Sequence, residues 1–137
     1  MSGSSPVADV VHAWLAKAED DLRAAELILA AGDDGPSDAA AYHAQQCVEK
    51  CLKALFVRRG VDCPRTHDIA MLVALLSEAG IEPPDLSAEE QVCLTAYATS
   101  IRYPGDYEPV SREEAVAAVV SARRVRGRVR SVLNVDG

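Results

Sequence analysis

The hydrophobic residues of this chain recur every three or four positions, which is the period of an α-helix. In the first such stretch they predict a helix over about 9–31, with an apolar stripe of Val11, Trp14, Ala18, Leu22, Ala25 and Leu29. The polar positions between them, which we expect to face solvent, are Lys17, Asp20, Asp21 and Arg23. No stretch alternates with the period of two that a half-buried β-strand shows, so the pattern favours an all-helical protein.

Helix breakers and capping residues divide the rest of the chain. The run from Gly32 to Pro36 predicts a turn, after which Ser37 can cap a second helix that ends at Gly60. We expect Thr66 to cap a third helix, closed by Gly80, whose inward residues are Ile69, Leu72, Val73 and Leu76. The breakers account for each predicted boundary, because glycine and proline interrupt regular helices.

Two capping boxes mark the last two helices. Ser87 with Glu90, and Ser111 with Glu114, have the spacing in which a serine side chain and a glutamate side chain satisfy each other's backbone N–H groups. The fourth helix should pack Leu94, Tyr97 and Ile101 inward. The fifth should run to about Leu133 with an apolar stripe of Ala118, Ala122, Val125, Val129 and Val132. The prediction is an all-α fold, an antiparallel bundle of about five helices.

Composition supports this fold and limits the class of protein. The chain has 137 residues, enough for one domain over 1–137, in which we expect 1–8 and 134–137 to be flexible. Apolar residues make up 49% of the chain but aromatic residues only 4%, a mixture suited to close-packed helices. No apolar run is long enough to span a membrane, and the N-terminus does not resemble a signal peptide. We therefore expect a soluble, cytoplasmic protein with no membrane partner, whose four cysteines are free thiols.

Charge is distributed in blocks. The net charge of −7 argues against general coating of nucleic acid, but residues 39–67 and 115–137 are each net positive. If these segments lie side by side, they form a local basic face that suits one phosphate or a short RNA. The equally supported alternative is two solvated helix faces. The arginines of the last helix are interpreted first as long side chains with buried stems, and second as a phosphate-facing or partner-facing edge: Arg123, Arg124, Arg126, Arg128 and Arg130.

The most unusual stretch is 43–55, which reads H-A-Q-Q-C-V-E-K-C-L-K-A-L. On a helix, one row would contain Tyr42, Gln46, Glu49 and Lys53, and a neighbouring apolar row would contain Ala44, Val48, Cys51 and Leu55. A helix that only filled a core would not need two amides beside a carboxylate and an ammonium. These groups either satisfy one another in a helix–helix contact or hold a ligand.

The remaining chemistry is sparse. His43, Cys47 and Cys51 are spaced by four, but the paired close ligands of a structural zinc site are missing. Nothing distinguishes one cysteine as a nucleophile, and no glycine-rich phosphate loop occurs. We expect no metal and no cofactor. The sharpest candidate is Arg102, followed by Tyr103, because a guanidinium fork suits a phosphate or a carboxylate. Equally, Arg102 could pair with Glu49 and only fasten two helices.

With these residues in view, the chain resembles the HEPN domain family, named for nucleotide binding in higher eukaryotes and prokaryotes. The resemblance covers nearly the whole chain. The matching pieces are A-x-x-D-L-x-x-A at Ala18, Asp21, Leu22 and Ala25; the 43–55 helix; T-H-D at Thr66, His67 and Asp68 with Leu72; R-Y-P at Arg102, Tyr103 and Pro104; and Glu114, Ala115 and Ala122 in the last helix. Each piece is short, but the five occur in order and at fitting distances.

The resemblance implies a helical bundle that forms homodimers and binds RNA or a nucleotide, often beside a small nucleotidyltransferase partner in toxin–antitoxin pairs. Catalytic members resemble metal-independent RNases with an Arg-x(4–6)-His motif. This chain departs from that motif, because Tyr107 stands five residues after Arg102 and no histidine follows His67. Histidine titrates near about 6.5 and tyrosine near about 10, so about one tyrosine in a thousand is a base at pH 7. A tyrosine that accepts a modification from such a partner is a further role that the resemblance implies for Tyr103 or Tyr107.

Three hypotheses follow. In the first, the chain is a nucleotide- or RNA-binding module in which Gln46, Lys50, Lys53, Arg102 and Tyr103 bind the ligand, while Glu49, His67 and Asp68 are structural. In the second it is a metal-independent endoribonuclease that uses Arg102 and Tyr107, with His43 or His67 as a substitute base. In the third it is a helical adaptor without catalysis, in which Glu49 and Lys53 form an ordinary ion pair.

Overall fold

The structure, a computed structural model, describes residues 5–98 and 108–134, and it folds them into five α-helices. These are α1 (Pro6–Ala30), α2 (Ser37–Arg58), α3 (Ile69–Glu78), α4 (Ala88–Ala96) and α5 (Arg112–Leu133), with one 3-10 turn, Gly32–Asp34, after α1. No strand occurs within these described ranges. The prediction of an all-α bundle of about five helices is confirmed.

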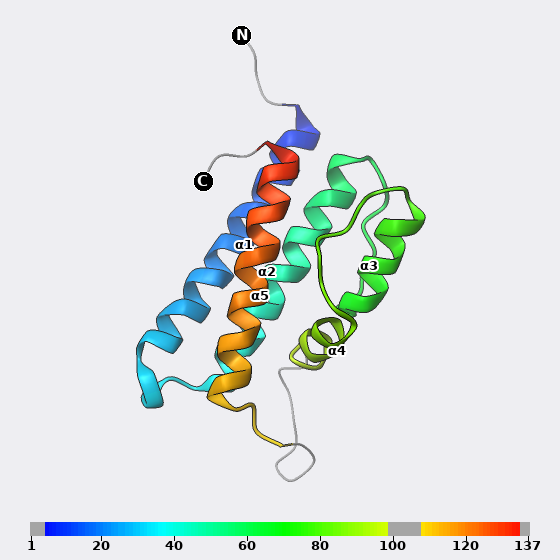
Figure 1. The fold of residues 1–137 in the computed structure, drawn as a ribbon. Helices are drawn as coiled ribbons and strands as arrows, with labels where there is room; N and C mark the ends of the chain where they lie inside the picture. The colour runs from blue at the N-terminus through cyan, green and yellow to red at the C-terminus, as the bar shows by residue number, and fades with distance from the viewer. Residues whose placement is uncertain (1–4, 99–107, 135–137) are drawn as a thin grey trace.

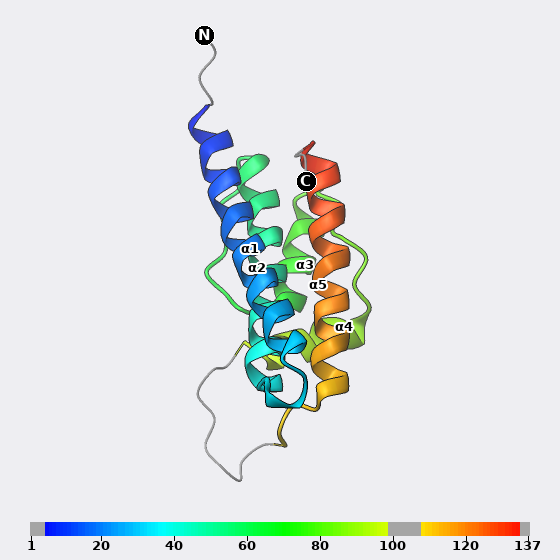
Figure 2. The same ribbon diagram turned by 90° about the vertical axis from the view of Figure 1, so that its left-hand side faces the viewer.

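Three long helices form the body of the bundle. Figures 1 and 2 show α1, α2 and α5 side by side, with α3 and α4 beside α2, and α4 also beside the starting half of α5. Helix α1 runs antiparallel to α2, as expected for helices joined by a short turn. Helix α5 runs in the same direction as α2, which is possible because α3 and α4 intervene in the chain.

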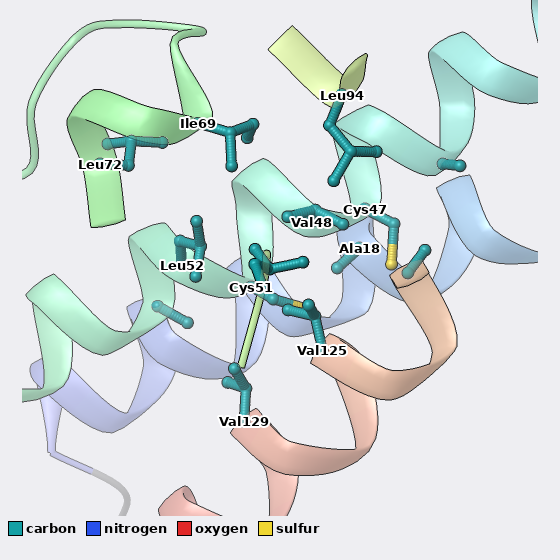
Figure 3. Close-up of a cluster of buried hydrophobic side chains, with 14 of the residues drawn as sticks. Ala18, Cys47, Val48, Cys51, Leu52, Ile69, Leu72, Leu94, Val125 and Val129 are labelled. Atoms are coloured by element: carbon teal, nitrogen blue, oxygen red, sulfur yellow. The ribbon is translucent and has the colours of Figure 1, made fainter. Parts of the chain in front are cut away.

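The core lies around α2. Figure 3 shows side chains of all five helices meeting there, with Cys47, Val48, Cys51 and Leu52 of α2 at the centre. The predicted apolar row of α2 is fully confirmed, since Ala44, Val48, Cys51 and Leu55 are all buried. Val132 differs from its prediction: it is 49% exposed, because the α5 stripe leaves the core at the end of the helix.

Most predicted boundaries agree with the structure. Both capping boxes are formed, at Ser87 with Glu90 and at Ser111 with Glu114. Gly60 and Gly80 adopt positive φ angles of 70° and 77° just after α2 and α3, as expected for residues that end helices. Helix α4 ends at Ala96, and Ile101, predicted to belong to it, lies outside the described residues.

Three helix starts correct the sequence-based interpretation. Helix α1 begins at Pro6, capped by the Ser5 side chain, so it starts about three residues earlier than predicted. Ser37 is the first residue of α2, and no side chain caps that helix. Helix α3 is capped by Asp68, which accepts a hydrogen bond from the Met71 N–H, and not by Thr66. A carboxylate is a better N-cap than a threonine hydroxyl, so the helix starts two residues later.

These caps predict different costs for two similar substitutions. Asp68→Ala should lower the free energy of unfolding by about 1 kcal/mol, because it removes a side-chain cap. Ser37→Ala should leave it within about 0.5 kcal/mol, because the Ser37 side chain makes no capping bond. Urea denaturation of both variants tests this, and an equal loss in the two would contradict the assignment of the caps.

Three arginines in the second half of α5 pair with carboxylates of neighbouring helices. Arg123 contacts Glu26 and Arg126 contacts Glu19, both on α1, while Arg124 contacts Glu90 of α4. These pairs tie α5 to its neighbours and neutralise the positive charge that the sequence concentrates there. Burial alone would raise the pKa of Glu90, but hydrogen bonds from Arg124, Ser121 and the Ser87 backbone lower it to about 2. Arg123, Arg124 and Arg126 therefore do not supply the local basic face that the charge blocks suggested.

The cysteines and the surface add two simple facts. Cys47, Cys51, Cys63 and Cys93 are all free thiols. A hydrogen bond with Cys51 and burial both raise the pKa of the Cys47 thiol, which makes it a poor nucleophile. Over the described part of the chain, none of the helices is both long enough and apolar enough to span a bilayer.

Candidate functional site

One face of α2 is polar although the helix is central to the core. We call the group Gln45, Gln46, Glu49, Lys50 and Lys53, together with His43, the polar face of α2. Gln45, Glu49 and Lys53 are buried, whereas His43, Gln46 and Lys50 are partly exposed. The face therefore has an inner part, whose groups bind one another, and an outer part that solvent can reach.

The inner part is organised by Glu49. Its carboxylate accepts hydrogen bonds from Lys53 Nζ at 2.7 Å, Gln45 Nε2 at 2.9 Å and His67 Nδ1 at 2.8 Å. The Lys53 ammonium also lies 5.7 Å from the centre of the Trp14 ring, a cation–π contact. One carboxylate thus joins α2 to α1, through Lys53 and Trp14, and to the segment before α3, through His67.

The charge on Glu49 is stabilised by these donors. Burial alone would raise the pKa of Glu49, but the hydrogen bonds from Lys53, Gln45 and His67 outweigh it and keep the pKa below its ordinary value. Glu49 is therefore ionised at neutral pH. Of the residues for which structural roles were predicted, Glu49 and His67 contact each other here, and Asp68 caps α3.

The T-H-D segment is fixed by further polar contacts. The Thr66 hydroxyl accepts a hydrogen bond from the Asp68 N–H, and Asp68 caps α3. The Ile69 N–H donates to the hydroxyl of Thr95 on α4, which in turn donates to the Gln91 carbonyl. Thr95 could not be predicted from the sequence, because a single hydroxyl in a short helix gives no pattern. Its role is to align the start of α3 with the end of α4.

The outer part is organised by Asp21 of α1. Asp21 was expected to face solvent, but it is only 9% exposed and contacts both His43 Nδ1, at 2.9 Å, and the Lys50 ammonium. The sequence signal that could have identified it is the A-x-x-D-L motif, in which an acidic residue adjoins the apolar stripe. Lys50 and His43 of α2 are thus both hydrogen-bond donors to the Asp21 carboxylate.

The Asp21–His43 contact gives the imidazole a defined orientation. The Asp21 carboxylate can only accept, so the protonated Nδ1 donates the hydrogen bond, and Nε2 takes no part in this pair. The His43 side chain is 34% exposed, and the Tyr42 ring packs edge-on against it with centroids 5.4 Å apart. A histidine held through one nitrogen by a carboxylate can bind an anion or transfer a proton with the other.

The structure separates the predicted ligand-binding residues into three groups. Gln46 and Lys50 lie together on the outer part, where Gln46 Nε2 donates to Gln45 Oε1 at 2.7 Å. Lys53 lies in the inner part, 10% exposed and bound to Glu49, so a phosphate would have to displace a buried carboxylate to reach it. Arg102, Tyr103 and Tyr107 lie outside the described residues.

Neither a metal site nor a cluster of metal ligands is found in the ranges that the structure describes. His43 is committed to Asp21, and Cys47 and Cys51 point into the core. The spacing of four between these residues therefore reflects helical packing. The site consists of amides, lysines, a histidine and Glu49 on α2, with Asp21 of α1 and His67 before α3, and it suits binding of an anionic ligand or proton transfer.

The five helices and the polar face of α2 place the chain among small helical-bundle proteins. Comparison with known proteins identifies its family. The family model of the HEPN domain matches residues 11–132, and the chain belongs to that family. The solved structure of TT1696 from Thermus thermophilus is 30% identical, with a TM-score of 0.70, over 88% of this chain and 96% of that one. ST0689, an archaeal HEPN homologue, has the same fold at 24% identity, with a TM-score of 0.60 over 88% and 95% of the two chains. No curated protein matches.

Proposed function

We propose that this HEPN-domain protein is a nucleotide- or RNA-binding module that works with a small nucleotidyltransferase partner, as in toxin–antitoxin pairs. The observation that supports it best is the outer part of the polar face, where His43, Gln46 and Lys50 are all solvent-accessible on one side of α2. Together they offer an ammonium, an amide and an oriented imidazole to a phosphate. Family membership supports the ligand class.

The charge of Asp21 sets the expected strength of binding. Lys50 is paired with Asp21, so a phosphate must compete with a carboxylate for the same ammonium. We therefore expect modest affinity that falls with salt, because each phosphate contact releases counterions. Arg102 and Tyr103 complete the proposed set of ligand-binding residues. We also propose a homodimer, in which each subunit contributes the outer part of its polar face.

A metal-independent endoribonuclease is the second candidate. The observation that favours it is the Asp21–His43 pair, because it supplies an oriented histidine to a chain that has Tyr107 at the position of the motif histidine. The Val110 N–H donates to Asp38 Oδ1, so the chain just before α5 is held at the start of α2, five residues from His43. Five residues span about 7.5 Å along a helix. Arg102 would stabilise the phosphate charge, and Tyr107 or His43 would take the proton.

One experiment separates binding, cleavage and a purely structural adaptor. Labelled single-stranded RNA would be incubated with the protein in excess chelator at neutral pH, and both anisotropy and cleavage products would be followed. We expect salt-dependent binding without cleavage, and weaker binding by Arg102→Ala. Cleavage that Arg102→Ala or His43→Gln abolishes would establish the endoribonuclease, and absence of any binding would leave the adaptor.

A further inference from the structure

A groove between α4 and the starting half of α5 lies outside the site described above. Its volume is about 510 Å³, and its apolar wall includes Leu94, Ala117, Ala118 and Val120. Figure 2 shows α4 lying beside this half of α5. Val120 is 49% exposed and Val116, one turn earlier on α5, is 41% exposed, so the apolar surface continues beyond the groove.

Polar links close the groove at its two ends. The Tyr97 hydroxyl donates to Glu114 Oε2 at 3.0 Å at one end. At the other end, the Ser121 hydroxyl and Arg124 both donate to Glu90 Oε2. These contacts hold α4 and α5 at a fixed separation, so the groove is a preformed feature of the bundle rather than a gap that the helices could close.

The charged residues that line the groove are all acidic, and Arg124 contacts one of them, Glu90, from beyond the lining. Among the residues that line it in the described structure, those with a formal charge are Glu89, Glu90 and Glu114, and no lysine or arginine lines it. Glu90 is paired with Arg124, whereas Glu89 makes no ion pair with any other described residue. Glu113, at the start of α5, adds a second exposed carboxylate without an ion pair in the described structure. The groove is therefore apolar with an acidic rim.

We propose that this groove binds a helix from another protein, one with an apolar stripe flanked by lysine or arginine. An amphipathic helix placed in an apolar groove is a common mode of recognition, and opposite charges at the rim favour one partner over others. A second copy of the chain is a poor occupant, because a two-fold interface brings the same patch of both copies together and would place the acidic rims against each other.

The test uses two synthetic peptides and the full chain. Both peptides carry the same leucine and alanine stripe, but one has lysine and the other glutamate at the flanking positions. In fluorescence anisotropy titrations, we expect the basic peptide to bind at least about tenfold more tightly, a difference of about 1.4 kcal/mol. The double variant Glu89→Lys with Glu113→Lys should reverse this preference. Equal binding of the two peptides would overturn the proposal.

A matched pair of variants locates the binding. Val120 and Val132 lie on the same helix and are both 49% exposed, but only Val120 lines the groove. Val120→Asp should weaken binding of the basic peptide about tenfold or more, whereas Val132→Asp should bind like the parent protein. Equal peptide binding by these two variants would overturn the proposal.

Light scattering provides a second test. If Val120→Asp alone converted a dimer to a monomer, the groove would be a self-interface and the proposal would be overturned. RNA binding should be unchanged in Val120→Asp. A negative result for the helix-binding groove can therefore be told apart from a negative result for the proposed RNA site.

Discussion

Glu49→Ala should lower the free energy of unfolding by about 3–5 kcal/mol, the cost of breaking a buried ion pair from one side. Three donors converge on the Glu49 carboxylate, whose side chain is 4% exposed. Its removal leaves the Lys53 ammonium, 10% exposed, with no carboxylate in its cluster. Since small proteins are stable by about 5–15 kcal/mol, the loss should be large in urea denaturation.

Two further variants identify the cause of that loss. Glu26→Ala removes the partner of Arg123 from an exposed pair and should cost less than about 1 kcal/mol. Glu49→Leu combined with Lys53→Met should recover much of the stability, because replacing both charges by apolar groups is often neutral. If Glu49→Ala were as stable as the parent protein, the carboxylate would not organise this part of the bundle.

The same carboxylate predicts a pH dependence. The pKa of Glu49 is lowered in the folded state, so its charge adds stability above the pKa that it has in the unfolded chain. That stability is lost as the pH falls through the folded pKa. Acid denaturation should therefore be steeper in the parent protein than in the double variant that lacks both charges.

Phe56→Ala is the second large effect that we expect, at about 3–5 kcal/mol. Phe56 is 1% exposed and is among the largest fully buried side chains of the core. Its truncation creates a cavity at the end of α2 that neighbouring side chains fill only in part. Met71→Ala is the control, because Met71 is 50% exposed and should change stability by no more than about 0.5 kcal/mol. Equal stability of both variants in urea would contradict the position of the core.

The fold could be predicted from the sequence because helical periodicity and capping boxes are local signals. The boxes at Ser87 and Ser111, and the glycines after α2 and α3, all appear where their spacing placed them. One error occurred where two residues competed for one role. Thr66 and Asp68 both suit an N-cap, and only the observed chain path shows that Asp68 takes it.

The site was predictable only in part, since its contacts join distant parts of the chain. The sequence indicates that the polar residues of α2 either satisfy one another or hold a ligand. In the structure, some of them are buried and paired, and others remain accessible to a ligand. Glu49 and Lys53 satisfy each other inside, while Gln46 and Lys50 stay accessible. The partner of His43 and Lys50 could not be predicted from α2, because Asp21 lies on another helix, 22 residues from His43. A helical wheel assigns Asp21 to the polar side but does not show that a neighbouring helix covers it.

The most direct test of the proposed ligand site uses two substitutions with opposite expected effects. Lys50→Met removes the accessible ammonium, and should weaken RNA binding and reduce its salt slope by about one. Asp21→Asn removes the carboxylate that competes for Lys50 and should strengthen binding. Arg123→Gln removes a cation of α5 that is paired with Glu26; it is the control and should have no effect on the slope. Fluorescence anisotropy over a range of salt concentrations measures all three. Opposite changes in Lys50→Met and Asp21→Asn would support the outer part of the α2 face as the phosphate site, and unchanged binding in Lys50→Met would contradict it.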